Sequence, residues 1–215
     1  MPPESSHPVS APPRAVVFDL GKVLLDFDYH IAARTLSPHS RLPDVEFKQV
    51  IDQSPLLHRY ESGGISTAQF EAEVRELTGY SGPATHFRNA FADIFAEIPD
   101  MTALHRGLRE RGIPTYIFSN TNEIAVGHIR NRFPFFRNFD GFILSYEIGV
   151  MKPAPDAYAA VERMTGARGS ELLYLDDRAE NIDAGARRGW RTILHAEPAA
   201  TRAEVLKHLP QLSLP

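Results

Sequence analysis

The chain has 215 residues, and 23 Lys and Arg against 27 Asp and Glu give it a net charge of −4. This acidic balance argues against a nucleic-acid-binding protein, which normally carries a basic excess or stripe. The absence of Cys excludes disulfides, thiolate zinc sites, iron–sulfur clusters and a cysteine nucleophile.

The N-terminal residues 1–13 are rich in Pro and Ser and show no periodicity. Such a segment buries too little apolar surface to fold, so we expect a disordered tail. It contains no long apolar run, and we therefore expect no signal peptide. No apolar stretch of about 18 residues follows, which argues against a transmembrane helix. These features predict a cytoplasmic protein that does not bind a membrane.

An alternating pattern of strands and helices occupies most of the remaining chain. The apolar run 15–19 is typical of a buried strand in a parallel sheet, and similar runs follow at 115–119, 141–145, 172–177 and 192–195. Segments with helical periodicity lie at 101–108, 124–132, 156–165 and 179–188. A capping box predicts that a last helix begins at Thr201. The alternation predicts an α/β, Rossmann-like core, a parallel sheet with helices on both faces.

Residues 29–98 are different, because no convincing strand is visible there. A capping box at 66–69 predicts the start of a helix that ends at Gly79. We therefore predict a small all-helical domain at 29–98, inserted after the first strand into a core domain of residues 14–28 and 99–215. Its two predicted apolar faces are Phe70, Val74 and Leu77, and Phe87, Phe91 and Phe95.

Polar residues stand at the ends of the predicted strands. Ligands bind beyond the carboxyl ends of the strands in an open parallel sheet, so we expect these side chains at one edge. Each alone has an ordinary explanation, since an Asp can cap a helix and a lone Lys is usually solvated. Their joint occurrence indicates a site. The residues are Asp19, Ser119 with Asn120, Lys152, and Asp176 with Asp177.

The three carboxylates of Asp19, Asp176 and Asp177 suggest a metal ion. Several carboxylates are costly to bury close together unless a cation neutralises them. Oxygen ligands without His or Cys favour Mg²⁺. A magnesium ion with a Lys and a Ser beside it is typical of a site that binds a phosphate group.

Four short motifs resemble those of the haloacid dehalogenase (HAD) superfamily. They are Phe18-Asp19-Leu20-Gly21, Phe118-Ser119-Asn120-Thr121-Asn122, Gly149-Val150-Met151-Lys152-Pro153 and Leu175-Asp176-Asp177-Arg178. The similarity spans about residues 14–196, and the helical insertion resembles the cap domain of that family in position. The motifs and the segment Tyr60-Glu61-Ser62-Gly63-Gly64-Ile65-Ser66 resemble the branch that includes bacterial α-D-glucose-1-phosphate phosphatase.

This resemblance implies an enzyme, a Mg²⁺-dependent phosphoric monoester hydrolase. The implied substrate is a small phosphorylated metabolite such as a sugar phosphate. Asp19 is implied as the nucleophile, which attacks phosphorus to give an aspartyl-phosphate. The implied Mg²⁺ ligands are Asp19, the backbone carbonyl of Gly21 and Asp177, with Asp176 either a ligand or in the outer shell.

The resemblance also implies how the phosphate is held. Ser119 and the backbone of Asn120 would donate hydrogen bonds to the phosphate oxygens. Lys152 would neutralise the negative charge of the phosphate and of Asp19. Asn181 would orient Asp177 or Lys152. These roles fit phosphoryl transfer, in which fixed donors and a cation stabilise the charge on the equatorial oxygens.

The sequence departs from the family pattern at Gly21. Most HAD phosphatases carry a second Asp there, which protonates the leaving oxygen and later activates water. General acid–base catalysis contributes typically ~10²–10⁴-fold, so the absence matters. The alternation at 24–28 also fits a short edge strand, but we expect at least one of Asp26 and Asp28 to face the cleft between cap and core. The candidate substitutes are Asp26, Asp28, His30, His58 and Glu61.

Other functions remain open at this point. The enzyme could be slow, or could prefer leaving groups that need little protonation. The chain could instead be an inactive module that binds phosphate without hydrolysing it. A haloacid dehalogenase also lacks the second Asp, but its chemistry needs no metal, so the Asp176-Asp177 pair argues against it. The sequence leaves the oligomeric state open between monomer and homodimer.

Overall fold

The structure is a computed structural model that describes residues 11–210. Most of the predicted N-terminal tail, residues 1–10, lies outside the described residues, as does the segment 211–215. None of the helices in the described part of the chain combines the length and apolar character needed to cross a membrane.

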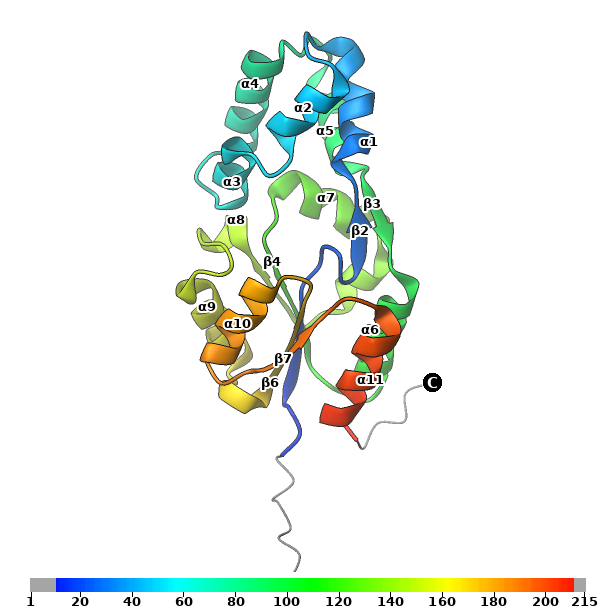
Figure 1. Ribbon diagram of the computed structural model, residues 1–215, viewed down its shortest axis with the longest axis vertical. Helices are drawn as coiled ribbons and strands as arrows, with labels where there is room; N and C mark the ends of the chain where they lie inside the picture. The colour runs from blue at the N-terminus through cyan, green and yellow to red at the C-terminus, as the bar shows by residue number, and fades with distance from the viewer. Residues whose placement is uncertain (1–10, 211–215) are drawn as a thin grey trace, which may run out of the picture.

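A five-stranded parallel sheet forms the centre of the larger layer of the molecule (Figure 1). Its strand order is β5-β4-β1-β6-β7. Every strand pair in this sheet is parallel. The predicted strands are confirmed to within a residue at each end. The strands are β1 Ala15–Phe18, β4 Thr115–Ser119, β5 Gly141–Leu144, β6 Leu172–Asp176 and β7 Arg191–Leu194.

Helices cover both faces of this sheet, as predicted. Residues alternate along β1, so Val16 and Phe18 join one apolar cluster and Val17 joins another. The first cluster includes residues of α6, α7 and α11, and the second includes residues of α9 and α10. These helices are α6 Pro99–Glu110, α7 Glu123–Arg132, α9 Pro155–Thr165, α10 Ala179–Arg187 and α11 Pro198–His208. Shorter elements are α8 Ser145–Ile148 and the 3₁₀ helices η2 Pro134–Asn138 and η3 Gly169–Glu171.

The prediction that the last helix begins with a capping box at Thr201 is wrong. Helix α11 begins at Pro198, three residues earlier, and no side-chain cap closes its N-terminus. The Thr201 hydroxyl lies 2.7 Å from Nδ1 of the buried His195. It is therefore engaged inside the core, where it cannot cap the helix.

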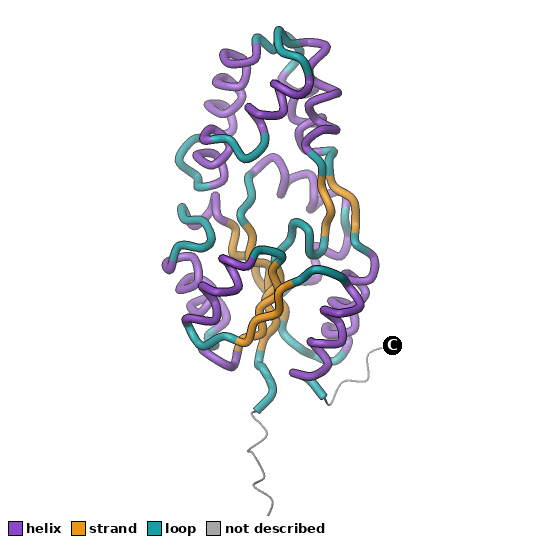
Figure 2. The backbone as a smooth tube through the Cα atoms, viewed as in Figure 1, coloured by secondary structure: helices purple, strands orange, loops and turns teal. Residues whose placement is uncertain are grey.

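Five helices form a second layer beyond the carboxyl ends of the strands (Figures 1 and 2). They pack around a separate apolar cluster, to which the large layer contributes Ile124. The helix predicted from the capping box of Ser66 and Gln69 is confirmed, and it ends at Gly79 with φ +67°. The helices are α1 Tyr29–Leu36, α2 Asp44–Ile51, α3 Pro55–Glu61, α4 Thr67–Thr78 and α5 Ala84–Ala92, with the 3₁₀ helix η1 Ser37–His39.

Two details of the helical layer differ from the sequence analysis. Residues 29–98 do contain a strand, because β3 Phe95–Glu97 pairs antiparallel with β2 Leu25–Phe27. Phe95 therefore lies opposite Phe27 in this ribbon and does not continue the helical face of α5. A three-residue strand is too short to show a period of two. Leu77 is 58% exposed, and Thr78 takes the buried position on α4 in its place.

Candidate active site

A cavity of about 510 Å³ lies where the carboxyl ends of the strands meet the helical layer. Residues that follow β1, β4 and β6 form one wall, and residues of α1, α2 and α3 form the other. This is the edge at which an open parallel sheet binds its ligands. The residues predicted to bind the metal and the phosphate all line this cavity except Asp176, which is fully buried beneath it.

Three carboxylates converge at the floor of this cavity. Asp19, Asp176 and Asp177 each offer one oxygen, and these oxygens lie within 4.8 Å of one another. Asp19 directly follows β1, whereas Asp176 ends the neighbouring strand β6. The parallel pairing of these two strands therefore brings the acids together.

The ammonium group of Lys152 lies between two of these acids. Its Nζ atom is 2.9 Å from Asp19 Oδ1 and 2.6 Å from Asp176 Oδ2. It also donates a hydrogen bond of 2.9 Å to the carbonyl of Phe118. The two carboxylates raise the pKa of Lys152, although its burial acts in the opposite direction as the largest single effect. The side chain is therefore a fixed cation with all three donors used.

Asp176 has both of its carboxylate oxygens occupied by donors. Oδ2 accepts from Lys152 and from the Tyr174 hydroxyl, and Oδ1 accepts from the Arg178 backbone N–H and from Asn181 Nδ2, each at 2.9 Å. Burial favours the neutral acid, but the charge of Lys152 and these hydrogen bonds together lower the pKa of Asp176. Its geometry suits a group that orients Lys152.

Asp19 retains a free oxygen. Its Oδ1 accepts from the Leu20 backbone N–H at 2.7 Å and faces Lys152, and no hydrogen bond within the described residues reaches Oδ2. Burial raises the pKa of Asp19 to about 7, with Lys152 opposing and Asp176 reinforcing the shift. Burial also raises the pKa of Asp177, whose side chain is half-buried. Both acids are thus held where a cation would stabilise their ionised forms.

The residues present fit a divalent cation. When ionised, the three carboxylates carry three negative charges and Lys152 carries one positive charge, which leaves a net charge of −2. The free donors are carboxylate oxygens, and the backbone of Gly21 also lines the cavity. A hard, oxygen-seeking ion such as Mg²⁺ matches this donor set.

The loop after β4 supplies further groups at the cavity. Ser119 is buried, and among residues 11–210 its Oγ forms a single weak hydrogen bond of 3.4 Å, to the Asn120 carbonyl. The Asn120 side chain donates to the Lys152 carbonyl at 3.0 Å and accepts from the Lys152 N–H at 2.8 Å. This pair of bonds fixes the Lys152 loop to the Ser119 loop.

Several supporting residues were missed by the sequence analysis. Besides the Asn120 amide, the Ser145 hydroxyl accepts from the Thr121 N–H and donates to the Thr121 carbonyl. The Tyr174 hydroxyl donates to Asp176 from within the same strand. A Tyr two residues before a strand-end Asp shares its face of the sheet, which is the signal that could have identified it.

The candidate substitutes for the missing acid lie in different places. Asp26 is exposed, pairs with Lys22 and does not line the cavity. His58 is also exposed and lies outside it. Asp28, His30 and Glu61 do line the cavity. The expectation that one of Asp26 and Asp28 faces the cleft therefore holds for Asp28.

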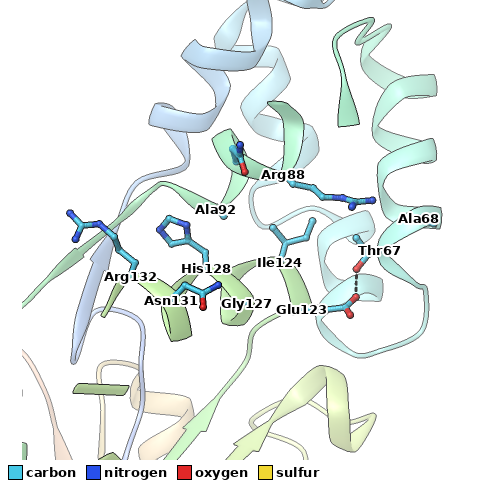
Figure 3. Close-up of a pocket in the computed structure, with 11 residues that line it drawn as sticks. Thr67, Ala68, Arg88, Ala92, Glu123, Ile124, Gly127, His128, Asn131 and Arg132 are labelled. Atoms are coloured by element: carbon cyan, nitrogen blue, oxygen red, sulfur yellow. Dashed lines mark hydrogen bonds between the residues drawn. The ribbon is translucent and has the colours of Figure 1, made fainter. Parts of the chain in front are cut away.

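A larger cavity, about 720 Å³, lies elsewhere, between α4, α5 and α7 (Figure 3). It is lined by Arg88, Glu123 and His128 among others, and by none of the clustered carboxylates. Thr67 at the start of α4 donates a hydrogen bond to Glu123 there, as the dashed line shows. This cavity therefore marks a polar contact between the two layers and lies apart from the carboxylate site.

Comparison with known proteins agrees with this geometry. A family model described as haloacid dehalogenase-like hydrolase matches residues 13–189. The chain is 27% identical over 201 residues to a D-ribitol-5-phosphate phosphatase of Bacteroides thetaiotaomicron, covering 88% of this chain and 95% of the relative. It is 24% identical over 178 residues to the sesquiterpene phosphatase astK of Aspergillus oryzae, covering 80% and 84%.

A solved structure shows the same fold. It is a HAD-family enzyme of Bacteroides thetaiotaomicron in complex with magnesium and inorganic phosphate, with a TM-score of 0.75 and 24% identity over 86% of this chain and 94% of that one. The protein described here belongs to the haloacid dehalogenase-like hydrolase family. It is therefore an enzyme of the hydrolase class, as the motifs predicted.

Proposed function

We propose that this protein is a Mg²⁺-dependent phosphatase that hydrolyses a small phosphorylated metabolite, with Asp19 as the nucleophile. The observation that carries the proposal is the convergence of Asp19, Asp176 and Asp177 around the buried ammonium group of Lys152. The names of the two curated relatives, both phosphatases, support the same activity.

In this proposal Asp19, Asp177 and the Gly21 carbonyl hold the metal ion. Asp176 belongs to the same acidic group, but its four hydrogen bonds favour an indirect role, in which it orients Lys152. A bound Mg²⁺ would offset the carboxylate charge and polarise the phosphoryl oxygens. Asn181 acts through Asp176, since its amide donates to Asp176 Oδ1.

Different residues of the chain carry out nucleophilic attack and stabilise the negative charge that develops. The free Oδ2 of Asp19 attacks phosphorus and forms an aspartyl-phosphate, and water hydrolyses this intermediate in a second step. The Ser119 hydroxyl and the Asn120 backbone N–H donate to the equatorial oxygens, where negative charge develops. The three N–H donors of Lys152 are already used by Asp19, Asp176 and the Phe118 carbonyl, so this side chain contributes the positive charge of a fixed cation beside the phosphoryl group.

The proposed substrate class is a sugar or polyol phosphate. The wall formed by the helical layer presents charged and amide groups to the cavity, among them Lys48, Asp52 and Gln53. Such groups can form hydrogen bonds with hydroxyls, whereas an apolar chain would displace water from them, including from the Lys48–Asp52 ion pair, without offering a new partner. This favours a substrate like that of the D-ribitol-5-phosphate phosphatase over a terpenoid phosphate.

Two alternatives remain as outcomes of the test. A dehalogenase would not need a metal ion at the three carboxylates. An inactive module would bind phosphate without releasing product. The cap and core domain boundaries at 29–98, the cytoplasmic location and the choice between monomer and homodimer also remain predictions.

The proposal is tested by phosphate release from p-nitrophenyl phosphate, ribitol 5-phosphate and α-glucose 1-phosphate, with Mg²⁺ or with EDTA. We expect Mg²⁺-dependent release by the wild-type protein and a loss of at least ~10³-fold in Asp19→Asn. Halide release from 2-chloropropionate in EDTA would instead support the dehalogenase. Phosphate binding without release from a wide phosphometabolite panel would support the inactive module.

A further inference from the structure

The proposed reaction, on which this inference rests, has to protonate an alkoxide leaving group. Position 21 cannot supply the acid, because it is a glycine in tight surroundings. A Cβ atom at Gly21 would lie 2.8 Å from Cε1 of Phe27, so the aromatic ring fills the space that a side chain would occupy. A proton donor must therefore come from another wall of the cavity.

The other carboxyl groups that line the cavity differ in how they are engaged. Asp28 caps helix α1 by accepting from the His30 N–H at 2.8 Å. Asp52 pairs with Lys48 across one turn of chain. Within residues 11–210, Glu61 forms no ion pair. It is the carboxyl group of this wall that has neither a capping role nor a cationic partner.

The chain around Glu61 is fixed against the large layer. Glu61 is the last residue of α3, and Gly63 follows with φ +70°. A Cβ atom at Gly63 would lie 2.5 Å from the backbone oxygen of Tyr146, so this loop rests directly on α8. The motif Tyr60–Ser66, noted in the sequence, thus serves as the contact between the two layers.

A second contact anchors the residue before Glu61. The Tyr60 hydroxyl accepts from the Ile124 N–H at 3.3 Å, in the first turn of α7. It also lies 2.7 Å from Thr67 Oγ1, which in turn donates to Glu123 (Figure 3). Helix α7 begins directly after the loop of Ser119 and Asn120. Glu61 is therefore held in a defined position relative to the groups that face the phosphate.

The surroundings of Glu61 favour its protonated form. Burial raises the pKa of Glu61 to about 7, opposed by a hydrogen bond with the Asn122 side chain and reinforced by the charge of Asp52. Tyr29, whose pKa burial also raises, interacts electrostatically with Glu61, and burial raises the pKa of the preceding residue, Tyr60, as well. A carboxyl group that titrates near neutral pH can both give and take a proton there.

We propose that Glu61, supplied by the helical layer, is the general acid and base of this enzyme. When Asp19 attacks phosphorus, the P–O bond to the leaving group breaks, and the leaving oxygen keeps the electron pair and takes the Glu61 proton. Glu61 carboxylate then accepts a proton from the water that attacks the aspartyl-phosphate. The bond from phosphorus to Asp19 breaks, which returns the free Asp19 carboxylate and a protonated Glu61.

Leaving-group dependence tests this assignment. Nitrophenolate is a stable anion near neutral pH and needs little protonation, whereas the alkoxide of ribitol does not leave without a proton. We expect Glu61→Gln, which keeps the shape of the side chain, to lower the first-turnover rate of phosphoryl transfer from ribitol 5-phosphate to the enzyme by ~10²–10³-fold. For p-nitrophenyl phosphate the expected loss in the first-turnover release of nitrophenol is less than ~10-fold, whereas hydrolysis of the aspartyl-phosphate, which is common to both substrates, should slow for both. Binding of inorganic phosphate by the variant, followed by calorimetry, should stay within ~3-fold of the wild-type value.

Two further variants sharpen the comparison. Glu76→Gln carries the same change at an exposed position of α4 and should leave both rates unchanged. Asp28→Asn removes the competing carboxyl group of the same wall. Equal losses of the first-turnover rate for both substrates in Glu61→Gln, no loss of that rate at all, or a loss of it selective for ribitol 5-phosphate in Asp28→Asn would overturn the assignment. If the wild-type protein releases phosphate from neither substrate, the proposed function itself fails.

Discussion

At the scale of single residues, the site is a compact network of opposite charges. Lys152 is 2% exposed in its side chain and faces Asp19 and Asp176, which are 10% and 0% exposed. Removing one partner from a buried ion pair leaves an uncompensated charge, which costs more than the pair contributes when intact. The same arrangement that is proposed to stabilise the phosphoryl group should therefore also contribute to the stability of the fold without a ligand.

Substitution of Lys152 should show this double role. We expect Lys152→Met to lower the free energy of unfolding by about 3 kcal/mol in the absence of Mg²⁺. We also expect it to abolish phosphate release. Urea denaturation measures the first effect, with Glu76→Gln as the control for a surface substitution. A Lys152→Met protein as stable as the wild type would show that the acids do not depend on this cation.

A second residue-scale prediction concerns the buried His105 on α6. Its ring stacks on Phe139 at a centroid distance of 3.8 Å, and its Nε2 lies 3.1 Å from Thr115 Oγ1. Burial, together with the charge of Arg109, lowers the pKa of His105 to about 4. The folded protein therefore binds this proton less readily than the unfolded chain, in which the pKa is about 6.5.

Stability should consequently fall as the pH drops through the range from about 6.5 to about 4. From pH 7 to pH 5 this one group should cost about 2 kcal/mol. Other acids also titrate in this range, so the difference between wild type and His105→Asn isolates the effect. The wild type should lose about 2 kcal/mol more than the variant in urea unfolding. Equal losses of the free energy of unfolding in the two proteins would contradict this prediction and show that the His105 imidazole lies in a more polar environment.

At the scale of elements, the sequence predicted the parallel sheet and the helices on its faces because each has a long, regular apolar pattern. It missed β3, whose three residues gain their structure from pairing with β2. It also placed the start of α11 too late, because Thr201 is used by His195. Such errors arise where contacts with residues distant in the sequence determine the conformation, because the local pattern of apolar residues does not reveal those contacts.

The same distinction separates the site residues that could be predicted from those that could not. Asp19 and Asp177 follow strands directly, so their edge of the sheet could be inferred from the chain order. Lys152 is separated from β5 by α8, and its motif, Gly149 to Pro153, indicated its place in the site. The roles of Tyr174, Ser145 and the Asn120 side chain depend on contacts between separate loops. Glu61 was one of several possible acids, and only its place on the cavity wall separates it from His58.

Two glycine substitutions test the contact between the layers. Gly63→Ala should lower the free energy of unfolding by about 1–3 kcal/mol, since φ is +70° and the Cβ would lie 2.5 Å from the Tyr146 oxygen. Gly127 lies within α7, and a Cβ there meets nothing within 4 Å. Gly127→Ala should therefore stabilise the protein by about 0.5–1 kcal/mol. Urea denaturation curves measure the free energy of unfolding of both variants. A change in the same direction for Gly63→Ala and Gly127→Ala would contradict this account.

At the scale of the whole molecule, two layers with separate apolar clusters enclose the polar cavity that contains the three acids. The large layer provides the three acids and the loop of Ser119 and Asn120, and the helical layer provides Glu61 and the other polar residues of the opposite wall. In the proposed function, phosphate binding falls to the large layer and proton transfer to Glu61, so each half of the site is incomplete without the other.

Metal binding should stabilise the whole fold. A ligand that binds only the folded state at 100 times its Kd adds about 2.7 kcal/mol to the free energy of unfolding. We expect Mg²⁺ to raise Tm, EDTA to reverse the rise, and Asp177→Asn to weaken the effect strongly. A Tm that does not respond to Mg²⁺, measured by calorimetry with Ca²⁺ and Na⁺ as controls, would contradict the cation site.

The most direct measurement traps the phosphoryl group on the enzyme. Wild-type protein in excess is mixed with p-nitrophenyl phosphate and Mg²⁺, quenched in acid within the first turnover, and digested for mass spectrometry. The account predicts one added phosphoryl group on the peptide that contains Asp19, and none in Asp19→Asn. Phosphate release that continues in Asp19→Asn, or a phosphoryl group found on another residue, would contradict the central claim.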